Sequence, residues 1–234
     1  APSHVSAMMS GVMIKMGVYG LLRTVVLLGG PAPGWGTVLI VLGLAGALGG
    51  IALALFQRDV KRALAYSSVE NMGLIVLGLG LGFWGATSGR PGVAALGFAG
   101  GLLHVWNHAA MKGLMFLGAG SILHGAGTRD MERLGGLMKP MPATGALMTV
   151  GAVAISALPP LNGFVSEWLL YVGLVRGGMV SGGVGTIAPL IAVGALAIVG
   201  GLAGACFVRL IGIVFLGTPR HDAARHAHES GASM

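Results

Sequence analysis

The chain has 234 residues, of which 55% are hydrophobic and only 9% are charged, and its mean hydropathy is +0.86. Apolar runs of about 20 residues can cross a bilayer, and this chain carries several such runs. The net charge of +7 comes from basic residues dispersed between the apolar segments, which excludes a nucleic-acid-binding patch. The single cysteine, Cys206, excludes an intrachain disulfide and a cysteine-based metal cluster. The composition therefore predicts an all-α, polytopic membrane protein.

Six segments are long and apolar enough to span a membrane. They cover residues 4–28, 37–57, 64–84, 92–124, 142–176 and 186–217. We expect a transmembrane helical bundle over residues 1–217, followed by a polar C-terminal tail over 218–234. Small residues allow membrane helices to pack closely, and we expect this at Gly46, Gly50, Ala54, Gly200 and Gly204.

Basic residues are distributed unevenly between the two ends of these segments. If the segments alternate in direction, one side of the membrane carries eight Lys and Arg residues and the other carries three. The larger group is Arg58, Lys61, Arg62, Arg129, Arg133, Lys139, Arg220 and Arg225, and the smaller group is Arg23, Arg90 and Arg176. Because cytoplasmic loops carry the excess of basic residues, the side with the larger group is predicted to be cytoplasmic.

The first segment contains Lys15 near its middle, within MMSGVMIKMGVYGLL. A lysine at the centre of a membrane helix costs about 2.5 to 3.5 kcal/mol on insertion scales, so such a lysine usually has a function. Our interpretation is that Lys15 exchanges protons. The alternative is a lysine that reaches the interface or forms a structural pair.

The fourth segment contains His104, His108 and Lys112, four residues apart, in GFAGGLLHVWNHAAMKGLMFLGAG. On a helix this spacing forms one polar stripe roughly 12 Å long. Two histidines at i and i+4 can bind a metal, but HVWNH lacks the glutamate of a zinc-protease helix and no third ligand is near in sequence. Imidazole has a donor and an acceptor nitrogen, so the stripe favours a proton relay over metal binding or structural hydrogen bonding.

The fifth segment contains a helix-breaking sequence, ALPPLNGFVSEW. Pro159, Pro160 and Gly163 remove backbone hydrogen bonds in mid-segment, so we expect an interrupted helix. Glu167 follows the interruption, where freed backbone groups can admit water. We predict a relay or exit site at Glu167, with a structural salt bridge as the alternative.

Several other signals favour structural interpretations. The GxGxxG spacing of Gly80, Gly82 and Gly85 lies at the end of an apolar segment without a preceding strand, so it does not predict dinucleotide binding. Glu70 is expected to form a salt bridge with Lys61 or Arg62. Arg209 is expected to be structural or interfacial. Three histidines of the tail are expected to be solvated, namely His221, His226 and His228.

Four stretches of the sequence resemble one known family. They are SHVSAMMSGVMIKMGVYGLLR, DVKRALAYSSVENMGLIVLGLG, LHVWNHAAMKGLMFLGAGSILHGAGTRDMERLGGL and ALPPLNGFVSEWLLY. The chain resembles the antiporter-like, proton-conducting membrane subunits of respiratory complex I, Mrp-type cation/proton antiporters and group 4 hydrogenases. The SHVSAMMSG and SSVEN strings are most similar to the large membrane subunit of formate hydrogenlyase and hydrogenase-4-type complexes, component B.

The resemblance implies a fold of two inverted repeats, each housing half a proton channel with a broken helix. This chain would correspond to the second half of such a subunit, and we expect it to be a fragment of a longer polypeptide. By resemblance, Lys15 links the two half-channels, His104, His108 and Lys112 occupy the second half-channel, and Glu167 is its terminal site.

The resemblance also implies an environment for the chain. We expect a multi-pass protein of the cell inner (plasma) membrane whose partners are other membrane subunits and a peripheral hydrogenase or electron-transfer module, with no redox cofactor or metal bound by this chain. The predicted function is proton translocation within an oxidoreductase complex. Two alternatives remain open, which are an Mrp-type Na⁺/H⁺ antiporter subunit and a non-conducting structural anchor for a hydrogenase module.

Overall fold

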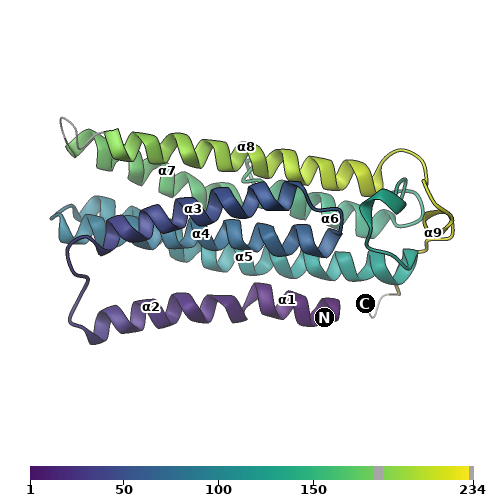
Figure 1. The fold of residues 1–234 in the computed structure, drawn as a ribbon, viewed down its shortest axis with the longest axis horizontal. Coiled ribbons are helices and arrows are strands. Elements are labelled where there is room, and N and C mark those ends of the chain that lie inside the picture. The colour runs from purple at the N-terminus through teal and green to yellow at the C-terminus, as the bar shows by residue number, and fades with distance from the viewer. Residues whose placement is uncertain (182–186, 232–234) are drawn as a thin grey trace.

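A computed structural model describes residues 1–181 and 187–231 of the chain. Its long helices run side by side in an elongated bundle (Figure 1). The helices are α1 (Ser3–Gly11), α2 (Met16–Leu27), α3 (Trp35–Leu55), α4 (Val60–Thr87), α5 (Pro91–Ala126), α6 (Pro142–Ile155), α7 (Asn162–Ser181), α8 (Ile187–Phe215) and α9 (Asp222–Arg225), with 3₁₀ turns η1 (Met13–Lys15) and η2 (Met131–Arg133). The described residues form no strand beyond one isolated bridge pair, so the all-α prediction is confirmed.

The predicted segments coincide with helices, but the fourth and fifth are not among the described stretches that are long and apolar enough to cross a membrane. Within the described residues, four stretches are long and apolar enough to cross a membrane, namely Ser3–Leu27, Trp35–Leu55, Val60–Thr87 and Ile187–Phe215. The fourth predicted segment is the single 36-residue helix α5, and the fifth is the broken pair α6 and α7. Many large apolar side chains point outward, as expected for surfaces that meet lipid or other membrane helices. The chain is a multi-pass membrane protein.

Glycines bring α3, α4 and α5 into close contact. A Cβ on Gly43 of α3 would collide with the backbone of Leu77 on α4, and a Cβ on Gly78 of α4 would lie 2.7 Å from the Gly101 Cα on α5. The prediction of close packing is confirmed at Gly50, which meets the Glu70 backbone. The prediction of close packing is wrong for Gly200 and Gly204 of α8. Within the described residues, both glycines have open space around them.

The basic loops gather at one end of the bundle, together with the N-terminus and α9 (Figure 1). There Arg129 Nε forms an ion pair with Asp59 Oδ2 at 3.0 Å, and Arg220 Nη1 donates to Met131 O at 3.1 Å. Arg209 of α8 donates to the carbonyls of Leu55 and Gln57 near the same end, so its structural role is confirmed. The α2–α3 connection lies at the opposite end. This arrangement agrees with the predicted alternation of the spans.

Two spans are interrupted, one as predicted and one unexpectedly. The helix in the fifth segment ends at Ile155 and resumes at Asn162, as Pro159, Pro160 and Gly163 predict. In the first segment, the 3₁₀ turn Met13–Lys15 separates α1 from α2. The sequence has no proline there, so only the structure revealed this second interruption.

Part of the C-terminal tail folds back onto the bundle, although its three histidines are exposed, as we expected. Glu229 accepts hydrogen bonds from the Ala143 N–H at 2.9 Å and from the Thr144 hydroxyl. These donors lie in the first turn of α6, where backbone N–H groups have no intrahelical acceptor. Burial alone would raise the pKa of Glu229, but the hydrogen bonds from Thr144 and Ala143 outweigh it and hold that pKa below its ordinary value. The His228 ring also packs edge-on against His124, 5.7 Å between centroids.

Candidate functional site

The polar stripe of α5 faces the interior of the bundle. His104, His108 and Lys112 are each at most 1% exposed, whereas Trp106, two residues from His104, is 77% exposed. The rings of His104 and His108 lie nearly parallel, with centroids 6.3 Å apart. A helix that buries these groups and exposes Trp106 is oriented by their polarity, because ionisable side chains avoid lipid.

Lys112 is held by the polar part of α4. Its Nζ donates to the Leu64 carbonyl at 2.8 Å and to the Ser67 hydroxyl. Across residues 1–181 and 187–231 no carboxylate forms an ion pair with Lys112. Since a buried ammonium needs compensation, its neighbours have to supply hydrogen-bond acceptors, and α4 does so.

His104 joins α4 to α7. Its Nε2 lies 3.0 Å from Asn71 Oδ1, and its Nδ1 lies 2.9 Å from Ser166 Oγ. Asn107 of α5 also donates to Ser166 Oγ at 3.1 Å and to the Asn162 carbonyl at 2.7 Å. The imidazole and Asn107 together fix the first turn of α7 directly after the interruption.

His108 differs from His104 in its hydrogen bonding. The side chain is fully buried, yet neither ring nitrogen has a hydrogen-bonding partner among the described residues. A buried polar group without a partner costs about 1 to 3 kcal/mol, so its retention calls for an explanation beyond packing.

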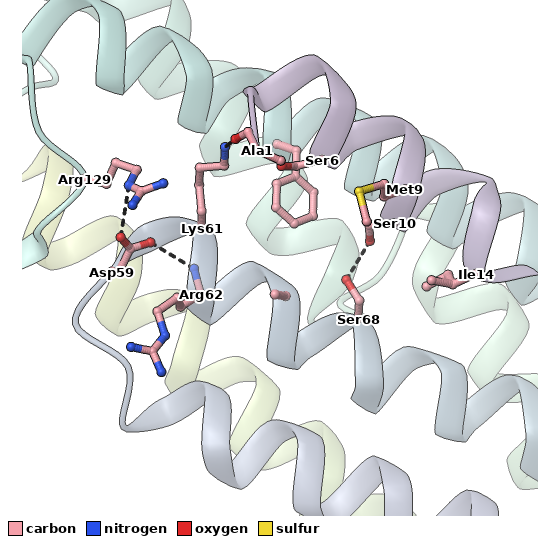
Figure 2. Close-up of a pocket in the computed structure, with 12 residues that line it drawn as sticks. Ala1, Ser6, Met9, Ser10, Ile14, Asp59, Lys61, Arg62, Ser68 and Arg129 are labelled. Carbon is pink, nitrogen blue, oxygen red and sulfur yellow. Dashed lines mark hydrogen bonds and ion pairs between the residues drawn. The ribbon is translucent and has the colours of Figure 1, made fainter.

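Lys15 lies in the interrupted part of the first span and is connected to Lys112. Its Nζ donates to the Ser10 carbonyl at 2.5 Å, and Ser10 Oγ lies 2.6 Å from Ser68 Oγ on α4. The Ser68 hydroxyl lies 2.9 Å from the Leu64 carbonyl, the acceptor that Lys112 also uses. Figure 2 shows the Ser10–Ser68 contact in the wall of an open pocket of about 370 Å³, with the Asp59–Arg129 ion pair farther along the same pocket.

Glu167 lies on α7, shortly after the interruption, and is buried. A cavity of about 490 Å³ adjoins it and extends toward α8. Its lining includes Ser156, Trp168, Tyr171 and Gly201. Glu167 directly follows Ser166, so the hydrogen bonds of His104 reach the residue beside this carboxyl group.

The structure brings in polar residues that the sequence interpretation left out of the site. They come from α1, α4, α5 and α7, and they are Ser10, Ser67, Ser68, Glu70, Asn71, Asn107 and Ser166. Four of them belong to the SSVEN string that carries part of the family resemblance. A row of polar residues inside the 28-residue apolar helix α4 was a usable signal, since such residues are costly in a membrane.

The predicted salt bridge of Glu70 with Lys61 or Arg62 is wrong. Glu70 is 1% exposed, and its Oε2 accepts a hydrogen bond from Asn71 at 3.2 Å. Lys61 instead donates to the Ala1 carbonyl, and its position on α4 is about 13 Å along the axis from Glu70. Glu70 lies within electrostatic range of Lys112 and Glu167, so it belongs to the buried polar network.

A family model described as "NADH:quinone oxidoreductase/Mrp antiporter, TM" matches residues 1–191. The chain belongs to this family. Two similar members come from Escherichia coli strain K12. Hydrogenase-4 component B is 45% identical over 100% of this chain, and formate hydrogenlyase subunit 3 is 45% identical over 97% of it. The chain spans 35% and 37% of those two proteins, about a third of their length.

Solved structures agree with the family assignment. A chain of the archaeal respiratory membrane complex called membrane-bound sulfane sulfur reductase superposes with a TM-score of 0.78 and 28% identity, over 97% of this chain and 36% of that one. The Mrp complex of Dietzia sp. DQ12-45-1b gives a TM-score of 0.68 at 24% identity, over 79% of this chain and 31% of that one, which supports the fold. Both are multi-subunit membrane complexes, and the resemblance inferred from the motifs is confirmed.

In this family member, the buried polar network has two parts that meet at Ser67, which accepts hydrogen bonds from Lys112 and from Asn71. The first part runs from Lys15 through Ser10 and Ser68 to the α4 carbonyl that holds Lys112. A second part runs from Asn71 through His104 to Ser166 in the first turns of α7.

Proposed function

We propose that this chain forms the proton-translocating part of a membrane subunit in a hydrogenase or formate hydrogenlyase-type oxidoreductase complex. The observation that carries the proposal is the full burial of Lys112, held by polar groups of α4 that also connect toward Lys15. The names of the two Escherichia coli relatives indicate the type of complex.

The proposed path uses Lys15, His104, His108, Lys112 and Glu167 as proton-carrying groups. Serine hydroxyls and imidazole rings both donate and accept hydrogen bonds, so they can pass a proton between titratable side chains. His108 is the position where the described residues offer no partner to a buried ring. We propose that water binds there and connects the His108 ring to the relay beside Lys112, because a bound water satisfies buried polar groups at little cost.

Glu167 is the proposed terminal site. The cavity of about 490 Å³ beside it has room for several water molecules, and Ser156 and Tyr171 contribute polar groups to its lining. A carboxyl group at the edge of such a space can exchange protons with water that enters the bundle where the helix is interrupted.

Coulombic coupling links the sites in this proposal. When electron transfer in a peripheral module of the complex changes the charge near one site, the proton affinities of the other sites in the membrane unit, residues 1–217, change. In a low-dielectric interior a change of charge on Lys112 alters proton affinity at Lys15 and Glu167, because unit charges interact over many ångströms there. The redox centres belong to partner subunits.

The geometry favours protons over sodium ions. A sodium site needs several free oxygen ligands, and Ser166 and Asn162 are polar residues of α7 that precede Glu167 in sequence. Ser166 Oγ already accepts a hydrogen bond from Asn107, and the Asn162 carbonyl accepts another. Two relatives named as parts of Na⁺/H⁺ antiporters match only 75% of this chain, at 38% and 34% identity.

The test is proton transport by the purified full complex in proteoliposomes. We expect the wild-type complex to move protons at the same rate with and without sodium, and Glu167→Gln to lower that rate by about 100-fold while electron transfer continues. Glu132→Gln, at an exposed glutamate of η2, is the control and should leave transport unchanged. A sodium-dependent rate, or full transport in Glu167→Gln, would refute the proposal.

A further inference from the structure

The hydrogen bonds around His104 determine where its protons are. Asn71 Nδ2 donates to the Ser67 carbonyl at 2.8 Å, and a backbone carbonyl can only accept. The orientation of the Asn71 amide is therefore fixed, and its Oδ1 faces His104 Nε2 at 3.0 Å. Because an amide oxygen has no proton to give, His104 Nε2 must carry a hydrogen in every protonation state that keeps this contact.

The other ring nitrogen of His104 faces a hydroxyl group with two possible acceptors. Ser166 Oγ lies 2.9 Å from His104 Nδ1 and 3.0 Å from the Gly163 carbonyl. Asn107 Nδ2 donates into the same oxygen, and the orientation of its amide is fixed by its second bond, to the Asn162 carbonyl. The single hydroxyl proton of Ser166 can thus point either to His104 or to Gly163, but not to both.

Each position of the hydroxyl proton corresponds to one charge state of His104. When His104 is neutral, Nδ1 is bare and accepts from the Ser166 hydroxyl. When Nδ1 takes up a proton from the relay, His104 becomes a cation, Ser166 Oγ accepts from the new N–H, and the hydroxyl turns to the Gly163 carbonyl. One N–H bond forms at Nδ1 in this step, and the bond between that proton and its donor in the relay breaks, so the donor loses the unit of charge that His104 gains.

We infer that Ser166 is a positioning residue that reports the charge of His104 to the interrupted helix α7 by switching its hydrogen bond between Nδ1 and the Gly163 carbonyl. Gly163 lies in the first turn of α7, and Glu167 immediately follows Ser166. The switch therefore acts on the backbone that carries the proposed terminal site. This inference rests on the proposed proton relay only for its role in transport, because the tautomer and the hydroxyl switch can be observed without turnover.

The charged and titratable groups around His104 come from every neighbouring element. Lys15 lies in η1, Glu70 on α4, His108 and Lys112 on α5, and Glu167 on α7. None of them forms a hydrogen bond with the His104 ring, whose two nitrogens contact Asn71 and Ser166. Ser166 is thus the group through which a proton on Nδ1 acts on α7.

The first test is ¹⁵N NMR of histidine-labelled full complex in lipid, with the His104 signals assigned by their loss in His104→Gln. Neutral His104 is expected to carry its proton on Nε2, and its Nδ1 signal should show a hydrogen bond that Ser166→Ala removes and Ser166→Thr restores. Asn71→Leu should release the ring into both tautomers. Ser121→Ala, on α5 outside this network, is the control. A neutral Nδ1–H tautomer in the wild type, or an Nδ1 signal unchanged in Ser166→Ala, overturns the inference.

The second test measures proton transport by the same variants. Ser166→Ala is expected to slow transport about tenfold, as for loss of one hydrogen bond to a charged group, and Ser166→Thr should recover it. Wild-type transport in Ser166→Ala, together with a loss of transport in His104→Gln, would refute the role of the switch in transport and leave the relay standing. Wild-type transport in His104→Gln would refute the role of His104 in the relay, whereas the tautomer measurement would still decide the hydroxyl switch.

Discussion

The first membrane span and the α6–α7 span are both interrupted, but they close their interruptions in different ways. In the first span the interruption is one 3₁₀ turn, Met13–Lys15, and the Lys15 ammonium returns to the Ser10 carbonyl of α1. In the other, α6 ends at Ile155 and α7 starts at Asn162, and the nearby Glu167 borders a cavity. Both interruptions border a pocket, but only the first is also crossed by its own side chain, that of Lys15.

This difference suggests separate tasks for the two ends of the network. The Lys15 side chain binds the carbonyl of Ser10, whose hydroxyl contacts Ser68, and this placement suits transfer toward Lys112. A carboxyl group beside a cavity suits exchange with water. The comparison leads to four predictions, which are given from the largest expected effect to the smallest.

Replacing Lys15 tests whether the interruption of the first span, at Met13–Lys15, belongs to the proton path. In the full complex, Lys15→Met is expected to lower proton transport per electron by about 100-fold, because the relay loses a titratable group. The readout is acidification in proteoliposomes. Arg23→Met, at an exposed cation of the same span, should behave as wild type. If both variants transport normally, the first interruption has no part in conduction.

Adding a methyl group tests how tightly each interruption is packed. A Cβ at Gly163 would collide with the Ala154 carbonyl, whereas a Cβ at Gly11 would lie 3.4 Å from the Ala109 carbonyl. Gly163→Ala is expected to lower stability by about 1 to 3 kcal/mol, and Gly11→Ala by less than about 1 kcal/mol. Thermal unfolding in detergent measures both, with Gly194→Ala as a control in open space. Equal losses at the two glycines would contradict the described packing.

Removing the Ser10 hydroxyl tests the link from the first interruption to α4. Ser10→Ala deletes the contact with Ser68 at 2.6 Å but keeps the carbonyl that binds Lys15. Proton transport is expected to slow about fivefold, the equivalent of roughly 1 kcal/mol for one hydrogen bond. The matched variant Ser6→Ala removes a hydroxyl that donates to the Pro2 carbonyl and should have no effect. A null result for Ser10→Ala would mean that protons bypass Ser68.

The smallest effect concerns Glu229, which caps the start of α6, the helix that precedes the interruption in the fifth span. Since hydrogen bonds hold the pKa of Glu229 below its ordinary value, its carboxylate stabilises the fold above that value. The stability is lost as the pH falls through the lowered pKa. Glu229→Gln should therefore unfold at a lower temperature than the wild type at pH 7, with the difference shrinking in acid. A difference that grows in acid would have the wrong sign.

The fold could be predicted in large part because long apolar runs indicate membrane helices, and glycine, proline and charged residues indicate where those helices end. The proline pair and Gly163 marked the interruption of the fifth span, and the basic residues marked the loops that share one end of the bundle. The turn at Met13–Lys15 could not be read, because neither Gly11 nor the residues around it forbid a continuous helix. The role of Glu229 could not be read either, since it depends on a contact 85 or more residues away in sequence.

The candidate site could be predicted only along single helices. His104, His108 and Lys112 share a face of α5 by their spacing, and that arrangement appears in the structure. The partners on other helices, Asn71 and Ser166, required the packing of α4 and α7 against α5. Glu70 was assigned to the wrong partners because proximity in sequence to a basic cluster was taken as proximity in space.

Proton transport by the full complex carrying Lys112→Ala tests the central claim most directly, since Lys112 lies in the buried network that joins the two interruptions. In proteoliposomes, with transport normalised to electron transfer, we predict a fall of about 100-fold for Lys112→Ala. Lys139→Ala, at an exposed lysine near the start of α6, should leave the ratio unchanged. A wild-type ratio of protons to electrons in Lys112→Ala would contradict the account.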